Sequence, residues 1–188
     1  MEISKENKFV DFMKKYWAYT VLGLVVFAVA LTFTLAFSLS PKNVPVSNNQ
    51  LSFRLPMQNA LVVKDFSNTE LQKNETLNQW EAHLAVDLTS DASDVFAVAD
   101  GTVANVEYSY LDGYTVTINH ADGFVSTYSS LSESEIASVG AKVNAGDKIG
   151  VAEKTASGEL ELGSHLHFSL MKDNSFVNPN DYLDLQIK

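Results

Sequence analysis

The sequence contains no cysteine, which excludes a disulfide framework as the source of its stability. Any metal site in this chain must therefore be built from histidine and carboxylate ligands. The chain also has no internal repeat, heptad pattern or low-complexity tract, which excludes solenoid and coiled-coil architectures. Its 188 residues are enough for one domain with its own hydrophobic core, besides shorter terminal segments.

Basic residues are scarce, with 13 lysines and arginines against 23 aspartates and glutamates, for a formal net charge of −10. The first 15 residues hold four lysines and three acidic residues. The remaining chain therefore holds nine basic and 20 acidic residues, a net charge of −11. Such a surface repels polyanions, which argues against nucleic acid and teichoic acid as ligands and favours a basic protein surface.

Charge is absent altogether from residues 16–41, between Lys15 and Lys42. The apolar part of this stretch, residues 18–39, would be about 33 Å long as a helix, enough for the roughly 30 Å of bilayer hydrocarbon. A cleaved signal peptide is the alternative, but its apolar region is usually only about 7–15 residues long. We therefore expect a retained transmembrane helix over residues 16–40.

The basic residues near this stretch predict its orientation. The segment before it carries Lys5, Lys8, Lys14 and Lys15, whereas the near side beyond it has only Lys42. The positive-inside rule then gives a cytoplasmic tail over residues 1–15 and places the bulk of the chain outside the cytoplasm. Residues 41–56 are polar and contain three of the four prolines, so we expect a linker there and an extracytoplasmic domain over residues 57–188.

The domain shows the pattern of short strands separated by turns. Residues 114–120 alternate between apolar and polar side chains, Asp122-Gly123 is a turn signal, and residues 124–128 form the returning run. Similar runs recur at a spacing of roughly 8–12 residues, which favours an all-β sandwich or barrel. The polar stretch 67–80 is the exception, and its pattern fits a short helix or a loop equally well.

Three of the four histidines lie in two short motifs, His83-x-x-x-Asp87 and His165-x-His167. On extended strands, residues two or four positions apart share a face, so each motif could present its side chains together. Imidazole and carboxylate groups suit zinc, which takes three protein ligands and a water in catalytic sites. The spacing alone is weak, because a histidine on a strand is more often a hydrogen-bonded structural residue than a ligand.

The surrounding sequence resembles the lysostaphin-like (LytM-type) zinc endopeptidases. The resemblance rests on the run Gly163-Ser-His-Leu-His-Phe168 together with His83-x-x-x-Asp87, and on three intervening segments, 98–103, 116–123 and 143–150. It covers about residues 56–183. The resemblance implies an all-β, antiparallel β-sandwich domain that binds Zn²⁺ and, if active, cleaves peptidoglycan peptides.

Carried over by position, the resemblance makes His83, Asp87 and His167 the metal ligands and His165 one of two catalytic histidines. The family places its other catalytic histidine in a Tyr-x-His-Leu segment, where this chain has Tyr128-Ser-Ser-Leu131. Ser130 thus replaces the expected histidine, and a serine has no pKa near 7 with which to transfer protons. Losing a general acid–base group typically costs about 10²–10⁴-fold in rate. His120 matches a different family position, and we expect a turn-capping or surface histidine there.

The altered Tyr-x-Ser-Leu segment, one N-terminal span and one domain are similar to the stage II sporulation protein Q family. This resemblance implies a zinc-binding, catalytically inactive docking module in a sporulation intermembrane channel or engulfment complex. It also implies a protein partner resembling stage III sporulation protein AH, and a place in the forespore membrane facing the intermembrane space. The alternative is an active zinc metalloendopeptidase that binds peptidoglycan. A purely structural zinc site is compatible with the docking function.

Overall fold

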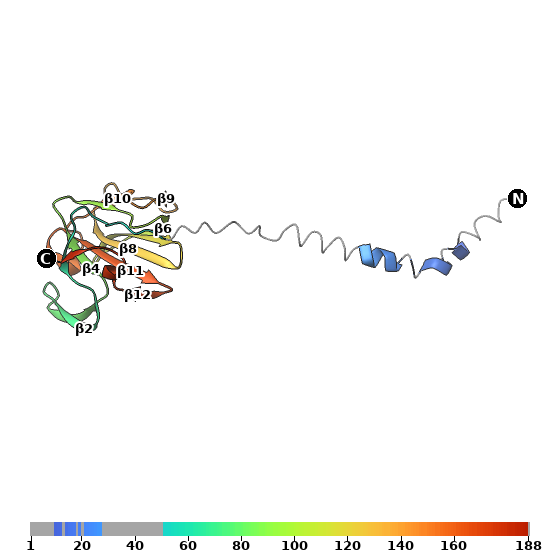
Figure 1. The fold of residues 1–188 in the computed structure, drawn as a ribbon, viewed down its shortest axis with the longest axis horizontal. Helices are drawn as coiled ribbons and strands as arrows, with labels where there is room; N and C mark the ends of the chain where they lie inside the picture. Colours follow the sequence, from blue (N-terminus) through green and yellow to red (C-terminus); the bar gives the residue numbers. More distant parts are fainter. Residues whose placement is uncertain (1–9, 13, 18, 20, 28–50, 188) are drawn as a thin grey trace. The chain divides into compact units, whose positions relative to one another are not determined.

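The structure is a computed structural model that describes residues 10–12, 14–17, 19, 21–27 and 51–187. Contacts within the chain divide it into two units, residues 1–48 and 49–188, and each is described by itself. The second unit holds every strand of the described chain and contains the candidate site (Figure 1).

The described residues of the first unit, between positions 10 and 27, are helical. Their large apolar side chains, Trp17, Tyr19 and Leu24 among them, are exposed. Within the described residues, no helix combines the length and the apolar character needed to cross a bilayer. Much of the expected transmembrane helix, residues 28–40, lies outside the described residues, so that helix stays a prediction.

The second unit is built on one nine-stranded sheet and two small sheets of two strands each. The order along the large sheet is β13-β1-β4-β11-β8-β7-β6-β9, and β12 also pairs with β11. All pairings are antiparallel except that of β1 with β13. The strands are β1 (Leu61–Lys64), β4 (Val86–Thr89), β6 (Gly101–Ser109), β7 (Gly113–His120), β8 (Phe124–Leu131), β9 (Lys142–Val143), β11 (Leu166–Lys172), β12 (Ser175–Val177) and β13 (Gln186–Ile187).

The all-β fold expected from the sequence is confirmed, and the predicted hairpin of residues 114–128 is the pair β7–β8. The small sheets pair β2 (Ser67–Asn74) with β3 (Gln79–His83), and β5 (Asp94–Phe96) with β10 (Lys148–Val151). The polar stretch 67–80, whose pattern left helix and loop open, belongs to the β2–β3 hairpin, which stands off the large sheet (Figure 1). Most of the β2 side chains are exposed, and the sequence therefore lacks the alternation of apolar and polar residues that would have predicted a strand.

Strand β11 shows how the large sheet separates its core from its site. Leu166, Phe168 and Leu170 are fully buried, whereas His167 and Ser169 between them are half-buried on the opposite face. This alternation follows from the period of two along a strand. The buried face packs against Val86 and Leu88 of β4 and the remaining core, whose side chains include Val95, Val116, Ile118, Tyr128, Leu131 and Ile149.

Residues 51–56, which the sequence assigned to a linker, contact the domain. The Arg54 amide donates to the Val98 carbonyl over 2.7 Å, and the Phe96 amide donates to the Pro56 carbonyl over 2.8 Å. The Phe53 ring packs edge-on against Phe124 with centroids 5.1 Å apart. The packed domain therefore includes residues N-terminal to position 57.

Candidate metal centre

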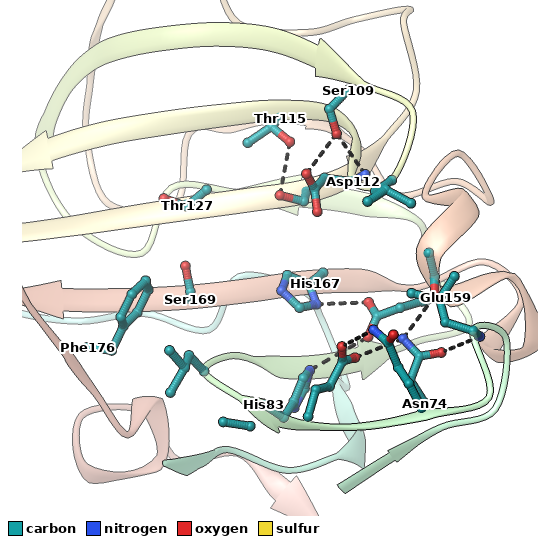
Figure 2. Close-up of a pocket in the computed structure, with 18 of the residues that line it drawn as sticks. Asn74, His83, Ser109, Asp112, Thr115, Thr127, Glu159, His167, Ser169 and Phe176 are labelled. Carbon is teal, nitrogen blue, oxygen red and sulfur yellow. Dashed lines mark hydrogen bonds and ion pairs between the residues drawn. The ribbon is translucent and has the colours of Figure 1, made fainter. Parts of the chain in front are cut away.

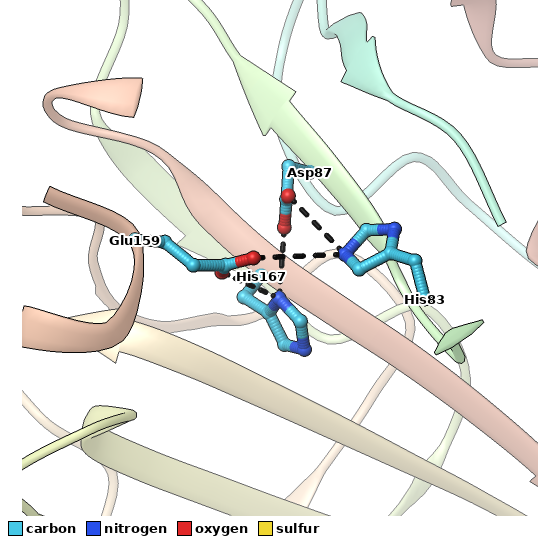
Figure 3. Close-up of side chains that lie close together, drawn as sticks. All are labelled: His83, Asp87, Glu159 and His167. Carbon is cyan, nitrogen blue, oxygen red and sulfur yellow. Dashed lines mark hydrogen bonds and ion pairs between the residues drawn. The ribbon is translucent and has the colours of Figure 1, made fainter. Parts of the chain in front are cut away.

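Four side chains converge beside strand β11, and their ligand atoms all lie within 4.8 Å of one another. They are His83, Asp87, Glu159 and His167, which Figure 3 shows pointing toward a common point. Three of these residues are the ligands that the sequence motifs indicated. The fourth, Glu159, comes from a segment that the sequence analysis did not single out.

Strand register brings Asp87 and His167 together, because the two are direct cross-strand partners in the β4–β11 pair. The Oδ1 atom of Asp87 lies 2.8 Å from Nδ1 of His167. His83 and Asp87 do not lie on one continuous strand, contrary to the extended arrangement considered from the sequence. Strand β3 ends at His83 and β4 begins at Val86, in a different sheet. An unbroken strand would separate positions 83 and 87 by about 13 Å, so the break at residues 84–85 is what lets both reach one ion.

The hydrogen-bond partner of His83 determines which of its ring nitrogens carries the proton. Its Nδ1 atom lies 2.8 Å from the carbonyl oxygen of Asp65, which can only accept a hydrogen bond, so Nδ1 carries the proton. In the neutral ring the Nε2 atom then presents a lone pair, and it lies 3.2 Å from Oδ2 of Asp87. Both atoms are buried without a hydrogen-bond partner. A cation placed between two buried acceptors that face each other would satisfy both of them. Metal-binding histidines usually donate their other ring N–H to a carbonyl or carboxylate oxygen, as His83 does here.

His167 lies between two carboxylates, with Nδ1 2.8 Å from Asp87 and 2.9 Å from Oε2 of Glu159. Burial opposes its charged form, but the bonds to these carboxylates outweigh burial and raise the pKa of His167 to about 10. The same interactions lower the pKa of Asp87 and of Glu159 against the effect of their burial. Both carboxylates are therefore ionised at neutral pH, as metal ligands must be.

The spacing of the four ligand atoms suits a small ion. Zinc bonds to nitrogen and oxygen are about 2.0–2.2 Å long, so tetrahedral ligand atoms stand about 3.3–3.6 Å apart. The distances to His83 Nε2 are 3.2 Å from Asp87 and 3.8 Å from Glu159. Those to His167 Nδ1 are 2.8 and 2.9 Å. These distances involve both oxygens of each carboxylate, and with one ligand atom per residue the four atoms lie within 4.8 Å of one another, so the side chains would close in around a tetrahedral ion.

His165, the predicted remnant catalytic histidine, lies beside the cluster but is only 1% exposed. Its Nδ1 atom is 3.0 Å from the Gly163 carbonyl, and its Nε2 atom is 3.4 Å from Oε2 of Glu159. Burial disfavours the charged ring, but the bond to Glu159 outweighs burial and raises the pKa of His165. His165 therefore contacts the cluster through Glu159.

A groove of about 490 Å³ opens beside the cluster, between the β2–β3 hairpin and the β6–β7 hairpin (Figure 2). Hydroxyl groups line its floor, from Thr115, Thr127, Ser129 and Ser169. Its charged lining residues, apart from the two histidines, are all acidic: Glu81, Glu107, Asp112 and Glu159. The groove therefore favours a ligand with basic or hydrogen-bonding groups.

Ser130, the residue predicted to replace the family's histidine, is fully buried and lies outside the lining of this groove. Its backbone adopts a left-handed conformation with φ of 62°. Its hydroxyl donates to the Glu153 carbonyl over 2.6 Å. Ser129 is the neighbour that faces the groove, opposite His167 in the β8–β11 pair, and it accepts a hydrogen bond from Thr115 over 3.0 Å.

His120 ends strand β7, five residues and about 17 Å along the strand from the groove residue Thr115. Its Nδ1 atom is 2.9 Å from the Asp100 carbonyl, and its Nε2 atom is 2.6 Å from the Ser126 hydroxyl. Because a carbonyl only accepts, Nδ1 donates to Asp100, and the Ser126 hydroxyl beside Nε2 itself donates to the Tyr128 hydroxyl over 3.0 Å. His120 is thus part of a hydrogen-bonded network remote from the cluster.

Comparisons with known proteins agree with this geometry. The model of Peptidase family M23 matches residues 81–179, more than half of the chain. Stage II sporulation protein Q of Bacillus subtilis (strain 168) is 29% identical over 215 residues, which cover 96% of this chain and 75% of that protein.

Two solved structures are similar in fold. The SpoIIQ–SpoIIIAH pore forming complex holds a chain with a TM-score of 0.61 and 29% identity, covering 71% of this chain and 91% of that chain. The catalytic domain of lysostaphin from Staphylococcus simulans has a TM-score of 0.51 and 23% identity, covering 63% of this chain and 88% of that one, a likeness of fold alone. With its family motif, its β fold and its converging His-Asp-His set, the chain belongs to peptidase family M23.

Proposed function

We propose that this chain is a zinc-binding M23 domain without hydrolytic activity, held at the membrane by residues 16–40 and used as a docking module in a sporulation channel or engulfment complex. The observation that carries the proposal is the combination of a complete ligand set with a groove that has no free histidine. His83 and His167 belong to the ligand set, His165 is buried against Glu159, and His120 is remote. These four are all the histidines of the sequence.

The metal part rests on the chemistry of the ligand atoms. The lone pair of His83 and the free oxygen of Asp87 are buried without partners, and leaving such groups unsatisfied is costly. Zinc suits two imidazoles with carboxylates, and when bound it would supply a positive charge that neutralises the two buried carboxylates. His83, Asp87 and His167 would hold it, with Asp65 fixing the His83 ring from behind.

The proposed lack of hydrolytic activity rests on an argument about proton transfer. Hydrolysis of a peptide bond needs a group near the metal that accepts and donates protons around neutral pH. Beside His167 the groove offers the hydroxyls of Ser129, Thr127 and Ser169, which do not titrate in that range. It also offers the Glu159 carboxylate, whose pKa is lowered, against the effect of burial, by its bonds to His165 and His167. The domain can therefore position a peptide without cleaving it at a useful rate.

The docking part rests on similarity. The match to stage II sporulation protein Q extends over nearly the whole chain, and the similar solved chain was determined in complex with SpoIIIAH. We expect a partner resembling stage III sporulation protein AH. The net charge of −10 and the acidic groove favour a partner with a basic contact surface.

The test is a binding measurement between the purified full-length chain and the SpoIIIAH-type protein of the same cell, by calorimetry at two salt concentrations. A basic protein of unrelated fold serves as the control for simple charge attraction. In parallel, the zinc-loaded chain is incubated with purified peptidoglycan. Saturable binding without release of muropeptides supports the proposal. Release of muropeptides that stops on chelation would instead make the chain an active endopeptidase.

Membrane anchoring has its own test, namely whether the chain stays with the membrane fraction after alkaline carbonate washing. A chain lacking residues 16–40 should move to the supernatant. Recovery of the full-length chain in the carbonate supernatant would overturn the anchoring part and leave the docking part untouched.

A further inference from the structure

We infer that Glu159 is a fourth protein ligand that occupies the position catalytic zinc sites keep open, so that the metal centre of this chain is closed. The inference rests on the proposed zinc site, and it concerns what that site can do. Catalytic zinc sites have three protein ligands and one exchangeable position, whereas structural sites have four protein ligands. His83, Asp87 and His167 supply three, and the fourth group within reach is the carboxylate of Glu159.

The carboxylate of Glu159 spans the two histidines of the set. Its Oε2 atom lies 2.9 Å from Nδ1 of His167, and its Oε1 atom lies 3.8 Å from Nε2 of His83. Figure 3 shows it entering from the side opposite His83. A carboxylate in this place would complete a set of two nitrogens and two oxygens around a metal ion and leave no position for an outside group.

Hydrogen bonds on two sides hold the backbone next to Glu159. It belongs to the short 3₁₀ segment η1 (Ser157–Leu162). The Gly158 amide donates to the Leu111 carbonyl over 3.0 Å, and the Gly158 carbonyl accepts from Asn74 Nδ2 over 3.0 Å. The approach at Gly158 is close, since a Cβ atom there would meet the Leu111 oxygen at 3.1 Å.

A third bond, from the Glu161 amide to Thr76 Oγ1 over 3.0 Å, ties the end of η1 to the turn between β2 and β3. The Glu159 side chain is itself held by Lys64, whose Nζ lies 3.0 Å from Oε1, with both side chains largely buried. The carboxylate is therefore preorganised toward the cluster, and ordering it on metal binding costs little.

Two consequences follow for this chain. A closed centre would link β3 and β4 to η1 and β11, which lie much further along the chain, so bound metal stabilises the fold. In addition, a substrate carbonyl finds no free coordination position. The missing second catalytic histidine and the closure of the metal centre by Glu159 are thus separate reasons for inactivity. A substitution that reverses one of them leaves the other in place.

The test uses Co²⁺ in place of zinc in the full-length chain, because its visible absorption reports the coordination number. The parent chain should give the strong absorption of a four-coordinate site, and added azide should leave the spectrum unchanged. In Glu159→Ala an exchangeable position opens, so azide should shift the spectrum in a saturable way. Zinc affinity, measured by competition with a chelator, should fall at least about tenfold, since even outer-shell changes cost about 10–100-fold.

The matched control is Glu161→Ala, which removes an exposed carboxylate from the same segment and should behave like the parent. If cobalt in the parent already responds to azide, the centre has an open position and the inference fails, while the zinc site of the proposed function still stands. If no variant and no parent binds either metal, the proposed zinc site itself fails. The parent spectrum decides the question even if Glu159→Ala does not fold.

Discussion

Asp87 and His167 are 80 residues apart in the chain and direct neighbours in the sheet, with Oδ1 and Nδ1 2.8 Å apart. The antiparallel register of β4 and β11 sets this pair, and a slip of one residue would turn His167 toward the core. The candidate metal centre therefore depends on the same strand pairing that buries Leu166 and Phe168. Stability of the sheet and integrity of the site are linked, and the predictions below use that link.

Replacing His83 with alanine should abolish the stabilisation that zinc provides. A ligand that binds only the folded state stabilises it by about 2.7 kcal/mol at 100 times its Kd, which corresponds to a Tm rise of roughly 5–15 °C for a domain of this size. The parent should show this rise, and His83→Ala should not. The measurement is thermal unfolding with and without zinc, and His120→Asn, a change at a remote histidine, should keep the rise.

Replacing Ser130 with histidine should destabilise the domain without producing hydrolysis. Ser130 is fully buried, has φ of 62° and donates to the Glu153 carbonyl. A larger ring at this position overpacks the interior, at a cost of about 1–3 kcal/mol, besides the loss of a hydrogen bond worth about 1 kcal/mol. Urea unfolding measures the loss, and a peptidoglycan digest measures activity. Ser130→Ala is the control that removes only the hydrogen bond; muropeptides released by Ser130→His would contradict the prediction.

His120 should make the parent less stable as the solution becomes more acidic. Burial lowers its folded-state pKa below the ordinary value of about 6.5, despite the hydrogen bond to the Asp100 carbonyl. The unfolded chain therefore takes up the proton first as the pH falls, and this favours unfolding. The stability that neutral His120 contributes is fully present above about pH 6.5 and is lost as the pH falls through the folded pKa.

The measurement is urea unfolding of the metal-free chain between pH 7.5 and pH 5, for the parent and for His120→Asn. His165 and His167 have raised pKa values and act in the opposite direction, but they are present in both proteins. The stability difference between parent and variant should thus shrink toward low pH. A difference that is constant across this range would show that His120 does not titrate differently in the two states.

Phe168→Ala should cost about 3–5 kcal/mol, the usual effect of removing a buried aromatic side chain. The Phe168 ring is fully buried in β11 and packs against Tyr128 with centroids 5.2 Å apart. Phe176→Ala is the matched control, because this ring is 43% exposed on β12 and its removal should cost well under 1–2 kcal/mol. Urea unfolding compares the two, and equal losses would mean that the core is placed wrongly. Zinc affinity of Phe168→Ala should fall with the stability of the sheet.

Local sequence patterns were sufficient to predict part of the fold and part of the candidate site. The alternation over residues 114–120 predicted a strand, and the Asp122-Gly123 signal predicted the turn of the β7–β8 hairpin. The two histidine motifs indicated His83, Asp87 and His167, which the structure brings together. These features could be predicted because a strand's period and a turn's backbone conformation depend on neighbouring residues.

By itself, then, the sequence determined the class of fold, the family and three members of the candidate metal-binding cluster. Only the tertiary structure decided that Glu159 joins them, that Ser129 rather than Ser130 faces the groove, and that residues 67–83 form a hairpin. Glu159 lies in an irregular 3₁₀ segment without periodicity, and its position depends on bonds to residues more than 40 positions away. Contacts of that kind arise from chain folding over long separations, which no local pattern encodes.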